Sequence, residues 1–172
     1  VLRSSTSICT ALSNGARGII PTNGPGQAGE MWTKVGADIA ILAGERDGIK
    51  IENFELGNSP FEFTAEAISD KFVIMATTNG TPIFEKASSA LLVLSCGLVN
   101  VGPVTNELAK ARLDTVIICS GRQGRFSVED TICGGMIIDL LETKHTISKD
   151  LNDAASLAQL LYRSNKDNLY EI

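Results

Sequence analysis

Short apolar runs alternate with helical patterns along this chain, and this alternation constrains the fold most. The runs interpreted as strands are 1–2 (a stub), 18–21, 39–43, 72–76, 91–94 and 115–119. Helical patterns follow at 5–14, 82–90, 101–112, 128–143 and 152–164. Such alternation is typical of α/β proteins, because helices cover the faces of a sheet. We predict an α/β fold of three layers, with a mostly parallel or mixed sheet and helices on both faces.

The segment 44–64 has no clear helical period, and its apolar residues predict a short hairpin. Those residues are Ile49, Ile51, Phe54 and Leu56. The stretch Asn-Ser-Pro that follows at 58–60 is typical of the start of a turn or a helix. Trp32 lies in another segment, where we expect it to pack a helix onto the sheet.

Length and composition favour a single domain over 1–172. The chain has 172 residues, of which 44% are hydrophobic and 20% charged, with a net charge of −5. An acidic surface gives no electrostatic reason to bind nucleic acid or an anionic membrane. No apolar run approaches the ~18 residues of a membrane span, and no targeting segment is recognisable. We therefore expect a cytoplasmic protein.

The four cysteines lie far apart in apolar surroundings and accompany a single histidine. This pattern argues against a zinc site and a disulfide framework, and favours buried, reduced thiols. The histidine, His145, lies in the polar stretch 142–150, where we interpret it as a solvated loop residue.

Polar loops follow the predicted strands, and they carry four of the seven arginines: Arg3, Arg46, Arg122 and Arg125. Open α/β sheets bind ligands at the carboxyl ends of their strands. Arginine binds phosphate and other oxyanions through paired N–H groups. The distribution of arginine therefore predicts a pocket for a polyanion.

The segment 119–130, CSGRQGRFSVED, joins an apolar run to a helical pattern. Ser127 suits the N-cap of that helix, and Glu129 and Asp130 suit its first turn. Arg122 and Arg125 do not suit a helix N-terminus unless an anion or those acids lie between them. We interpret the segment as an anion site.

The segment TTNGT at 77–81 has three hydroxyls around an Asn-Gly turn. We expect Thr81 to cap a helix that begins at Pro82. The same hydroxyls and exposed amides would also suit phosphate oxygens.

Carboxylates beside a phosphate pocket are what Mg²⁺ requires, because this ion takes one or two carboxylates together with substrate oxygens. The candidate metal ligands are Glu45, Glu129 and Asp130.

A rival chemistry uses Cys119, which precedes Arg125 by the spacing of Cys-dependent phosphatases. In those enzymes a thiolate attacks phosphorus, and a cysteine at a helix N-terminus has a lowered pKa. A non-catalytic binder of small dianions is a further alternative, and it would have no use for acids near its ligand.

Five stretches in order, VLRSST, LAGERDG, LGNSPFEFT, TTNGT and GRFSVEDTICGGM, resemble the 2-phosphosulfolactate phosphatases of coenzyme M biosynthesis. The resemblance implies Mg²⁺-dependent hydrolysis of (2R)-O-phospho-3-sulfolactate to 3-sulfolactate and phosphate, by a phosphoric monoester hydrolase. By motif it implies catalytic Arg125, Glu129 and Asp130, with substrate bound by Arg3, Ser5, Arg46, Asn58, Ser59, Thr77, Thr78, Asn79, Gly80 and Thr81. Family members have an Asp before the first motif and extend past the last helix, so we expect 1–172 to lack N- and C-terminal segments.

In the mechanism we expect, Mg²⁺ bridges an acid and the phosphate, and a carboxylate orients water in line. Arg125 and residues 77–81 stabilise the charge on the equatorial oxygens. Direct attack by water and a covalent aspartyl intermediate both remain open. The predicted partners are the small anionic substrate and a second subunit of a homodimer.

Overall fold

The computed structural model describes residues 1–145 and 150–169, and these form two compact units. The sheet unit comprises residues 4–93, and the helical unit comprises residues 1–3 together with the described residues from 94 onward. Each unit is considered by itself. No helix in the described part of the chain is long and apolar enough to cross a membrane.

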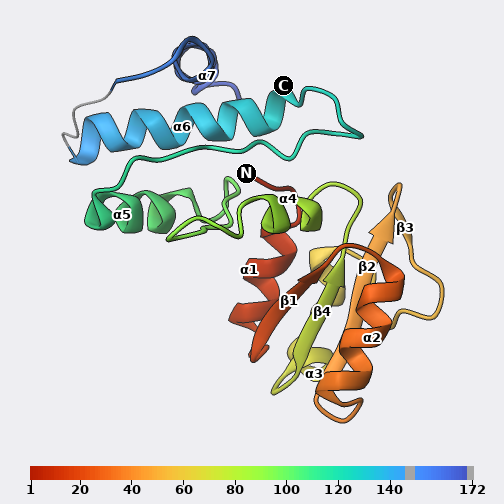
Figure 1. The fold of residues 1–172 in the computed structure, drawn as a ribbon. Coiled ribbons are helices and arrows are strands. Elements are labelled where there is room, and N and C mark those ends of the chain that lie inside the picture. Colours follow the sequence, from red (N-terminus) through yellow and green to blue (C-terminus); the bar gives the residue numbers. More distant parts are fainter. Residues whose placement is uncertain (146–149, 170–172) are drawn as a thin grey trace. The chain divides into compact units, whose positions relative to one another are not determined.

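The sheet unit is built on a mixed four-stranded sheet with the order β1-β4-β2-β3 (Figure 1). Strands β1 (Gly18–Thr22), β4 (Phe72–Ala76) and β2 (Ala40–Arg46) are parallel. The short β3 (Ile49–Lys50) lies antiparallel to the end of β2. The register aligns Thr22, Ala76 and Gly44, so the parallel strands deliver their following loops to one edge of the sheet.

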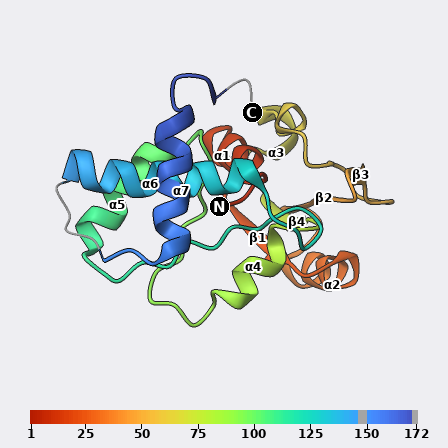
Figure 2. The ribbon, with the colours of Figure 1, turned by 90° about the horizontal axis from the view of Figure 1, so that it is seen from above.

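Helices cover both faces of this sheet, which confirms the three-layer α/β prediction (Figure 2). Side chains alternate between faces along each strand. Val73 and Met75 of β4 face α1 (Ser5–Ser13) and α3 (Ala65–Ile68), whereas Ile74 and Ala76 face α2 (Pro25–Val35). Trp32 of α2 packs on the second face, as predicted.

The predicted hairpin is present with a different partner strand. Strand β3 pairs with the end of β2 through a turn at Asp47 and Gly48, which both have positive φ. Leu56 then forms an isolated bridge beside Ala43. A 3-10 turn, η1 (Pro60–Glu62), follows where the sequence predicts a turn or helix.

The helical unit contains α5 (Val101–Ala111), α6 (Val128–His145) and α7 (Asp153–Asn165), close to the predicted ranges. Its core lies between α5 and α6 and includes Val101, Val104 and Ile137. Helix α7 crosses α6 and contributes no residue to this core (Figure 2). Helix α6 extends to His145, although the polar residues at 142–150 gave no sign of this. His145 is a half-buried helical residue, so the prediction of a solvated loop was wrong.

Three predicted strands, the stub at 1–2 and the runs at 91–94 and 115–119, are wrong, because the structure assigns no strand there. Val1 bonds both Ile118 and Ser120 through its backbone, and the N–H of Leu2 donates to the carbonyl of Cys96. These bonds follow the direction of a parallel ladder, but a strand requires a longer row of paired residues.

All four cysteines are free, as predicted. Cys96 and Cys133 are buried in the core of the helical unit, and Cys9 is half-buried. Cys119 is exposed, which corrects the expectation that every thiol is buried. Its segment ends in a loop and not in a core strand.

The contact between α6 and α7 depends on Gly135. A Cβ atom at this position would lie 2.0 Å from the carbonyl oxygen of Ala158, so the Gly135→Ala substitution must push the helices apart. We expect it to lower the free energy of unfolding by about 1–3 kcal/mol, measured by urea denaturation.

Gly134→Ala is the matched control. Its Cβ would lie 3.4 Å from Ile117, an ordinary contact, and alanine favours the helix by up to about 1 kcal/mol. Equal effects of the two substitutions would show that Gly135 has no special packing role.

Candidate functional site

A tight turn before α6 places two arginines side by side. Arg122 and Arg125 exchange both backbone hydrogen bonds, each 3.0 Å long, and form an isolated antiparallel bridge. Gln123 and Gly124 between them both have positive φ, which is typical of a type I′ turn. Residues paired in this way project their side chains to the same face, with Cα atoms about 5.5 Å apart. We call residues 121–125 the arginine turn.

The two arginines lack partners of opposite charge in the described part of the chain. Both side chains are exposed. Two guanidinium groups held this close repel each other, so an oxyanion between them would be stabilised by both. The same turn depends on Gly121, where a Cβ would lie 2.5 Å from the carbonyl oxygen of Arg125.

Asp130, in the first turn of α6, holds the start of the arginine turn through hydrogen bonds. Its Oδ2 accepts hydrogen bonds from the Gly121 N–H at 2.7 Å and from the Ser120 hydroxyl at 3.3 Å. The Ser127 hydroxyl accepts from the Asp130 N–H at 3.4 Å, as the predicted N-cap should. Asp130 is only 2% exposed.

Burial raises the pKa of Asp130 above the ordinary value of an aspartate, although the bond from Gly121 opposes the shift. A carboxyl group with a raised pKa is suited to general acid–base chemistry. Its neighbour Glu129 is half-exposed and forms an ion pair with Arg3. The helical unit therefore brings together Arg3, Arg125, Glu129 and Asp130.

Cys119 lies just before this turn, and its environment does not activate it. Partial desolvation of the thiol raises its pKa, and the charge of Asp130 adds to the shift. A thiolate nucleophile requires the opposite shift. The geometry therefore disfavours the Cys-dependent alternative.

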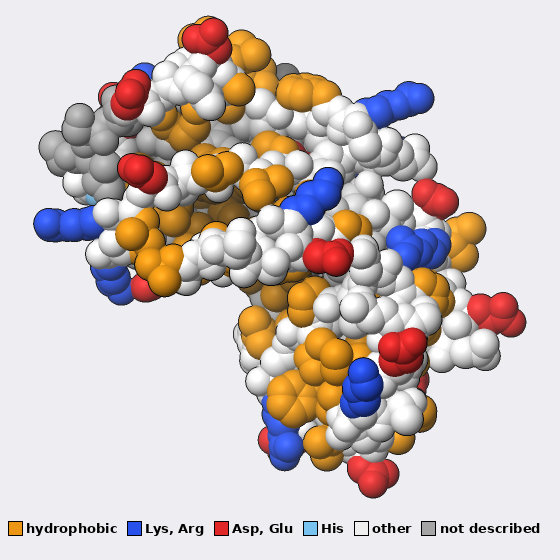
Figure 3. Space-filling view, in the orientation of Figure 1, with side chains coloured by type: hydrophobic (Ala, Val, Ile, Leu, Met, Phe, Trp, Pro, Cys, Tyr) orange, Lys and Arg blue, Asp and Glu red, His pale blue; other side chains and the backbone are white. Residues whose placement is uncertain are grey.

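The remaining predicted site residues lie in the sheet unit: Ser5, Glu45, Arg46, Asn58, Ser59 and Thr77–Thr81. On the face drawn in Figure 3, basic and acidic side chains are interspersed and do not gather by sign.

Glu45, at the end of β2, ties two loops together. Its Oε1 accepts from the Thr78 N–H at 2.8 Å, and its Oε2 accepts from the Thr78 hydroxyl at 2.9 Å. Oε2 also accepts from the Gly48 N–H at 2.8 Å. The carboxylate thus joins the β2–β3 turn to the loop after β4.

The loop after β4 is bonded to itself. The Thr77 hydroxyl accepts from the N–H groups of Gly80 and Thr81, each at 3.2 Å. The Thr81 hydroxyl accepts from the Thr77 N–H and donates to the Thr77 carbonyl, both at 3.1 Å. Most groups that the sequence offers to phosphate therefore have protein partners, and their binding to substrate stays a prediction.

Helix α4 (Thr81–Lys86) begins one residue before the predicted start. Gly80 and not Thr81 is the N-cap, and the Thr77 hydroxyl supplies the capping bonds. The helix also ends before residue 90, because the serines at 88 and 89 favour helices weakly.

Asn58 and Ser59 precede η1. The Ser7 hydroxyl of α1 donates to the Asn58 carbonyl at 2.7 Å, and the Glu62 carboxylate accepts from the Ser59 N–H at 3.3 Å. The Asn58 Oδ1 is buried without a hydrogen-bond partner in the described residues. Ser7 and Glu62 were not predicted as supports. The capping box of Ser59 with Glu62 was an available signal for Glu62, whereas no local pattern indicates Ser7, which lies 51 residues before Asn58.

Arg46 and Ser5 complete the predicted set. The Arg46 guanidinium donates to the Asn23 carbonyl at 3.4 Å. Ser5 is fully buried in the first turn of α1.

No group of three acidic, histidine or cysteine side chains in the described part of the chain could hold a metal ion. Mg²⁺ needs only one or two protein carboxylates when substrate oxygens supply other ligands. Glu129 fits that requirement, since it is a half-exposed, hard oxygen donor in the first turn of α6, whereas Asp130 is buried. Glu45 fits a loop-positioning role better, because both its oxygens already accept bonds.

Comparison with known proteins identifies relatives over the whole chain. The family model described as 2-phosphosulpholactate phosphatase matches residues 1–172. A probable 2-phosphosulfolactate phosphatase of Caldanaerobacter subterraneus subsp. tengcongensis is 39% identical over 171 residues, covering 99% of this chain and 70% of that protein. Proteins of the same description from Clostridium beijerinckii and Carboxydothermus hydrogenoformans are each 40% identical, covering 96% of this chain and 69% and 67% of theirs.

The substitution Glu45→Gln tests the positioning role of this carboxylate. An amide nitrogen cannot accept a hydrogen bond, so at least one of the three donors loses its partner. We expect the free energy of unfolding in urea to fall by about 1–3 kcal/mol. Glu52→Gln, at an exposed position, should change it by no more than about 0.5 kcal/mol. An equal loss in both variants would contradict the role.

Proposed function

Because the chain belongs to the 2-phosphosulpholactate phosphatase family, we propose that it hydrolyses (2R)-O-phospho-3-sulfolactate to 3-sulfolactate and phosphate, with Mg²⁺ as cofactor. The observation that supports this most directly is the arginine turn anchored on Asp130. It holds two cationic groups on one face of a loop that the Asp130 carboxylate fixes to α6, and a metal-assisted phosphatase needs such groups for the phosphate. The cytoplasmic location and the homodimer remain predictions.

The substrate carries a phosphate, a carboxylate and a sulfonate, so its site must compensate several negative charges. Arg122 and Arg125 project to one face and suit the phosphate, whose oxygens accept the N–H groups of both guanidiniums. Arg3, which pairs with Glu129, supplies a third positive charge in the same unit. Arginine is suited to sulfonate and carboxylate for the same geometric reason.

Glu129, and not the buried Asp130, would hold Mg²⁺, with substrate oxygens as further ligands. When bound, the ion would neutralise charge that develops on the phosphate oxygens. Glu129 is half-exposed, and its ion pair with Arg3 orients it.

Asp130 would act on the attacking water. In this step the water oxygen bonds to phosphorus, the bond from phosphorus to the substrate oxygen breaks, and the carboxylate of Asp130 takes a proton from the water. The departing oxygen receives a proton from solvent. The raised pKa of Asp130 makes its carboxylate a stronger base than that of an ordinary aspartate. Arg125 and Arg122 stabilise the charge on the equatorial oxygens. The positioning of the water and the phosphate supplies much of the remaining rate enhancement.

The contacts of the acids also separate catalysis from simple anion binding. A non-catalytic dianion binder has no use for carboxylates beside its arginines. Here Glu129 pairs with Arg3, and Asp130 bonds the loop that carries Arg122 and Arg125. The arrangement therefore favours the phosphatase over the binder.

The decisive assay is phosphate release from phosphosulfolactate, with Mg²⁺, with EDTA, and after treatment with iodoacetamide. We expect EDTA to abolish activity and Mg²⁺ to restore it. Alkylation should leave activity intact, because the raised pKa of Cys119 leaves little thiolate at neutral pH. Activity that survives EDTA and disappears on alkylation would overturn the metal mechanism, and no release at all would overturn the substrate.

Arg125→Gln should lower kcat/KM by about 10²–10³-fold, because one charged donor to the developing negative charge is lost. Arg125→Lys should recover part of this loss, since lysine keeps the charge without the paired N–H groups. Initial rates of phosphate release provide the measurement.

Arg17→Gln is the control, because Arg17 is an exposed residue of the sheet unit that lies 3.9 Å from Asp70. It should leave kcat/KM unchanged. If Arg125→Gln behaves like this control, Arg125 does not bind the phosphate.

A further inference from the structure

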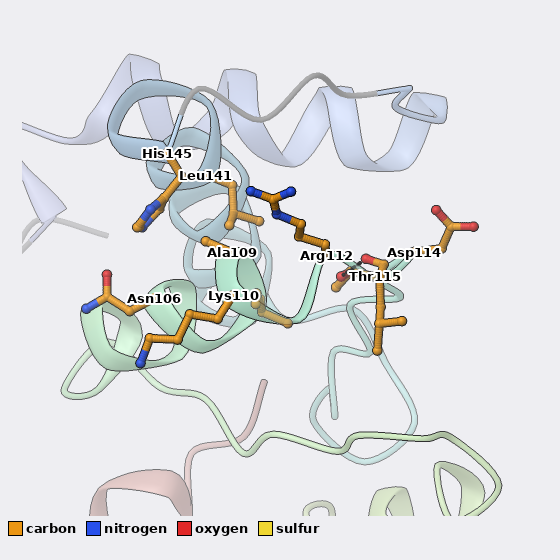
Figure 4. A pocket seen from close by; sticks show the side chains of 10 residues that line it. Asn106, Ala109, Lys110, Arg112, Asp114, Thr115, Leu141 and His145 are labelled. Atoms are coloured by element: carbon orange, nitrogen blue, oxygen red, sulfur yellow. Dashed lines mark hydrogen bonds between the residues drawn. The ribbon is translucent and has the colours of Figure 1, made fainter.

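A pocket lies in the helical unit, apart from the arginine turn. The pocket has a volume of about 1000 Å³ and lies between the last turn of α5, the following residues 113–115, and the end of α6 (Figure 4). None of the residues 119–130 lines it. Its volume lies within the range of small-molecule sites.

The walls of this pocket combine apolar and cationic groups. Leu108, Leu113 and Leu141 supply aliphatic surface, and Arg112 and His145 supply nitrogen donors. Figure 4 shows Arg112 and His145 on either side of Leu141. A ligand lying on the leucine could therefore meet both polar groups.

His145 carries the clearest sign of a missing partner. Its Nε2 is buried and has no hydrogen-bond partner among the described residues. A buried ring nitrogen without a partner costs free energy, and a ligand atom that reaches it after a small rotation of the imidazole would remove that cost.

Arg112 is the second sign. It is an exposed residue in the left-handed conformation, with φ 52°, and no acidic side chain in the described ranges forms an ion pair with it. By contrast, Lys110 donates to Glu107 at 2.7 Å, so its charge is already compensated. Asp114, the acidic residue in the lining, is directed away from Arg112 and His145 (Figure 4).

We infer that this pocket binds a small carboxylate with an apolar body. The carboxylate would accept hydrogen bonds from the Arg112 guanidinium and from His145, while the aliphatic part would lie against Leu108, Leu113 and Leu141. The C-terminal ends of α5 and α6, which carry partial negative charge, lie near this pocket and repel a carboxylate. The positive charge of Arg112 must outweigh that repulsion. The site is independent of the proposed phosphatase chemistry.

The protein contains one histidine, so the imidazole signal of His145 reports on this pocket alone. We would titrate the intact chain with hexanoate and follow the imidazole carbon-bound protons by NMR. Saturable shifts with a dissociation constant on the order of 1 mM are expected for a ligand of this size. Acetate tests the apolar body and hexanamide tests the charge, and each should bind at least about tenfold more weakly.

Arg112→Asn removes the charge at a position where asparagine tolerates the left-handed backbone, so the fold should survive. It should weaken hexanoate binding by about tenfold. Lys110→Gln is the matched control and should leave the affinity unchanged, because Lys110 is paired with Glu107.

Three results would overturn the inference: an imidazole signal that does not move with hexanoate, equal binding of hexanamide, or equal losses in the two variants. The last would indicate a general field effect in place of a built site. Far-UV circular dichroism of Arg112→Asn confirms that any loss of binding is not a loss of fold.

Discussion

The hydrogen bonds of the buried Asp130 carboxylate hold the candidate site of the helical unit together. They fix Ser120 and Gly121 against the start of α6, and the type I′ turn that follows then sets Arg122 and Arg125 on one face. Burying a carboxylate is costly unless it is hydrogen-bonded, and the two donors offset part of that cost. The part that remains raises the pKa of Asp130. One interaction thus both shapes the anion site and prepares an acid–base group.

The sheet unit uses the same device at the end of β2. There the Glu45 carboxylate joins the β2–β3 turn to the loop after β4. That loop lies at the carboxyl edge of the parallel strands because β2 and β4 run in register. Close approach of the two strands requires glycine at position 44, where a Cβ would lie 2.0 Å from the Ala76 carbonyl oxygen. Carboxylates that serve loops in this way look like metal ligands in the sequence, because both roles favour an acid at the carboxyl end of a strand.

Local sequence signals predicted the parts of the fold that depend on local physics. The β4 run at 72–76 and the helix beginning at Val128 lie where their apolar patterns and capping residues place them. The runs at 91–94 and 115–119 are also mostly apolar, yet neither forms a strand. A strand exists only through hydrogen bonds to another segment, and composition does not state which neighbours are present. For the same reason the hairpin was predicted among residues 49–56, whereas β3 pairs with β2.

The sequence by itself determined the α/β class, the helices α1, α5, α6 and α7, and the family. It also located the arginines and acids of the candidate site, because residue type and spacing express these directly. Only the tertiary structure decided what each polar group contacts. It divided the predicted residues between two units. The Thr77 and Thr81 hydroxyls bond backbone groups of their own loop, and Asp130 bonds the N–H of Gly121 at the start of the arginine turn. The structure also showed that His145, which the sequence places in a polar stretch, lines a pocket and has a buried Nε2 without a hydrogen-bond partner among the described residues. The physical reason is that a hydrogen bond or a buried charge depends on atoms distant in the chain, which only packing brings within reach.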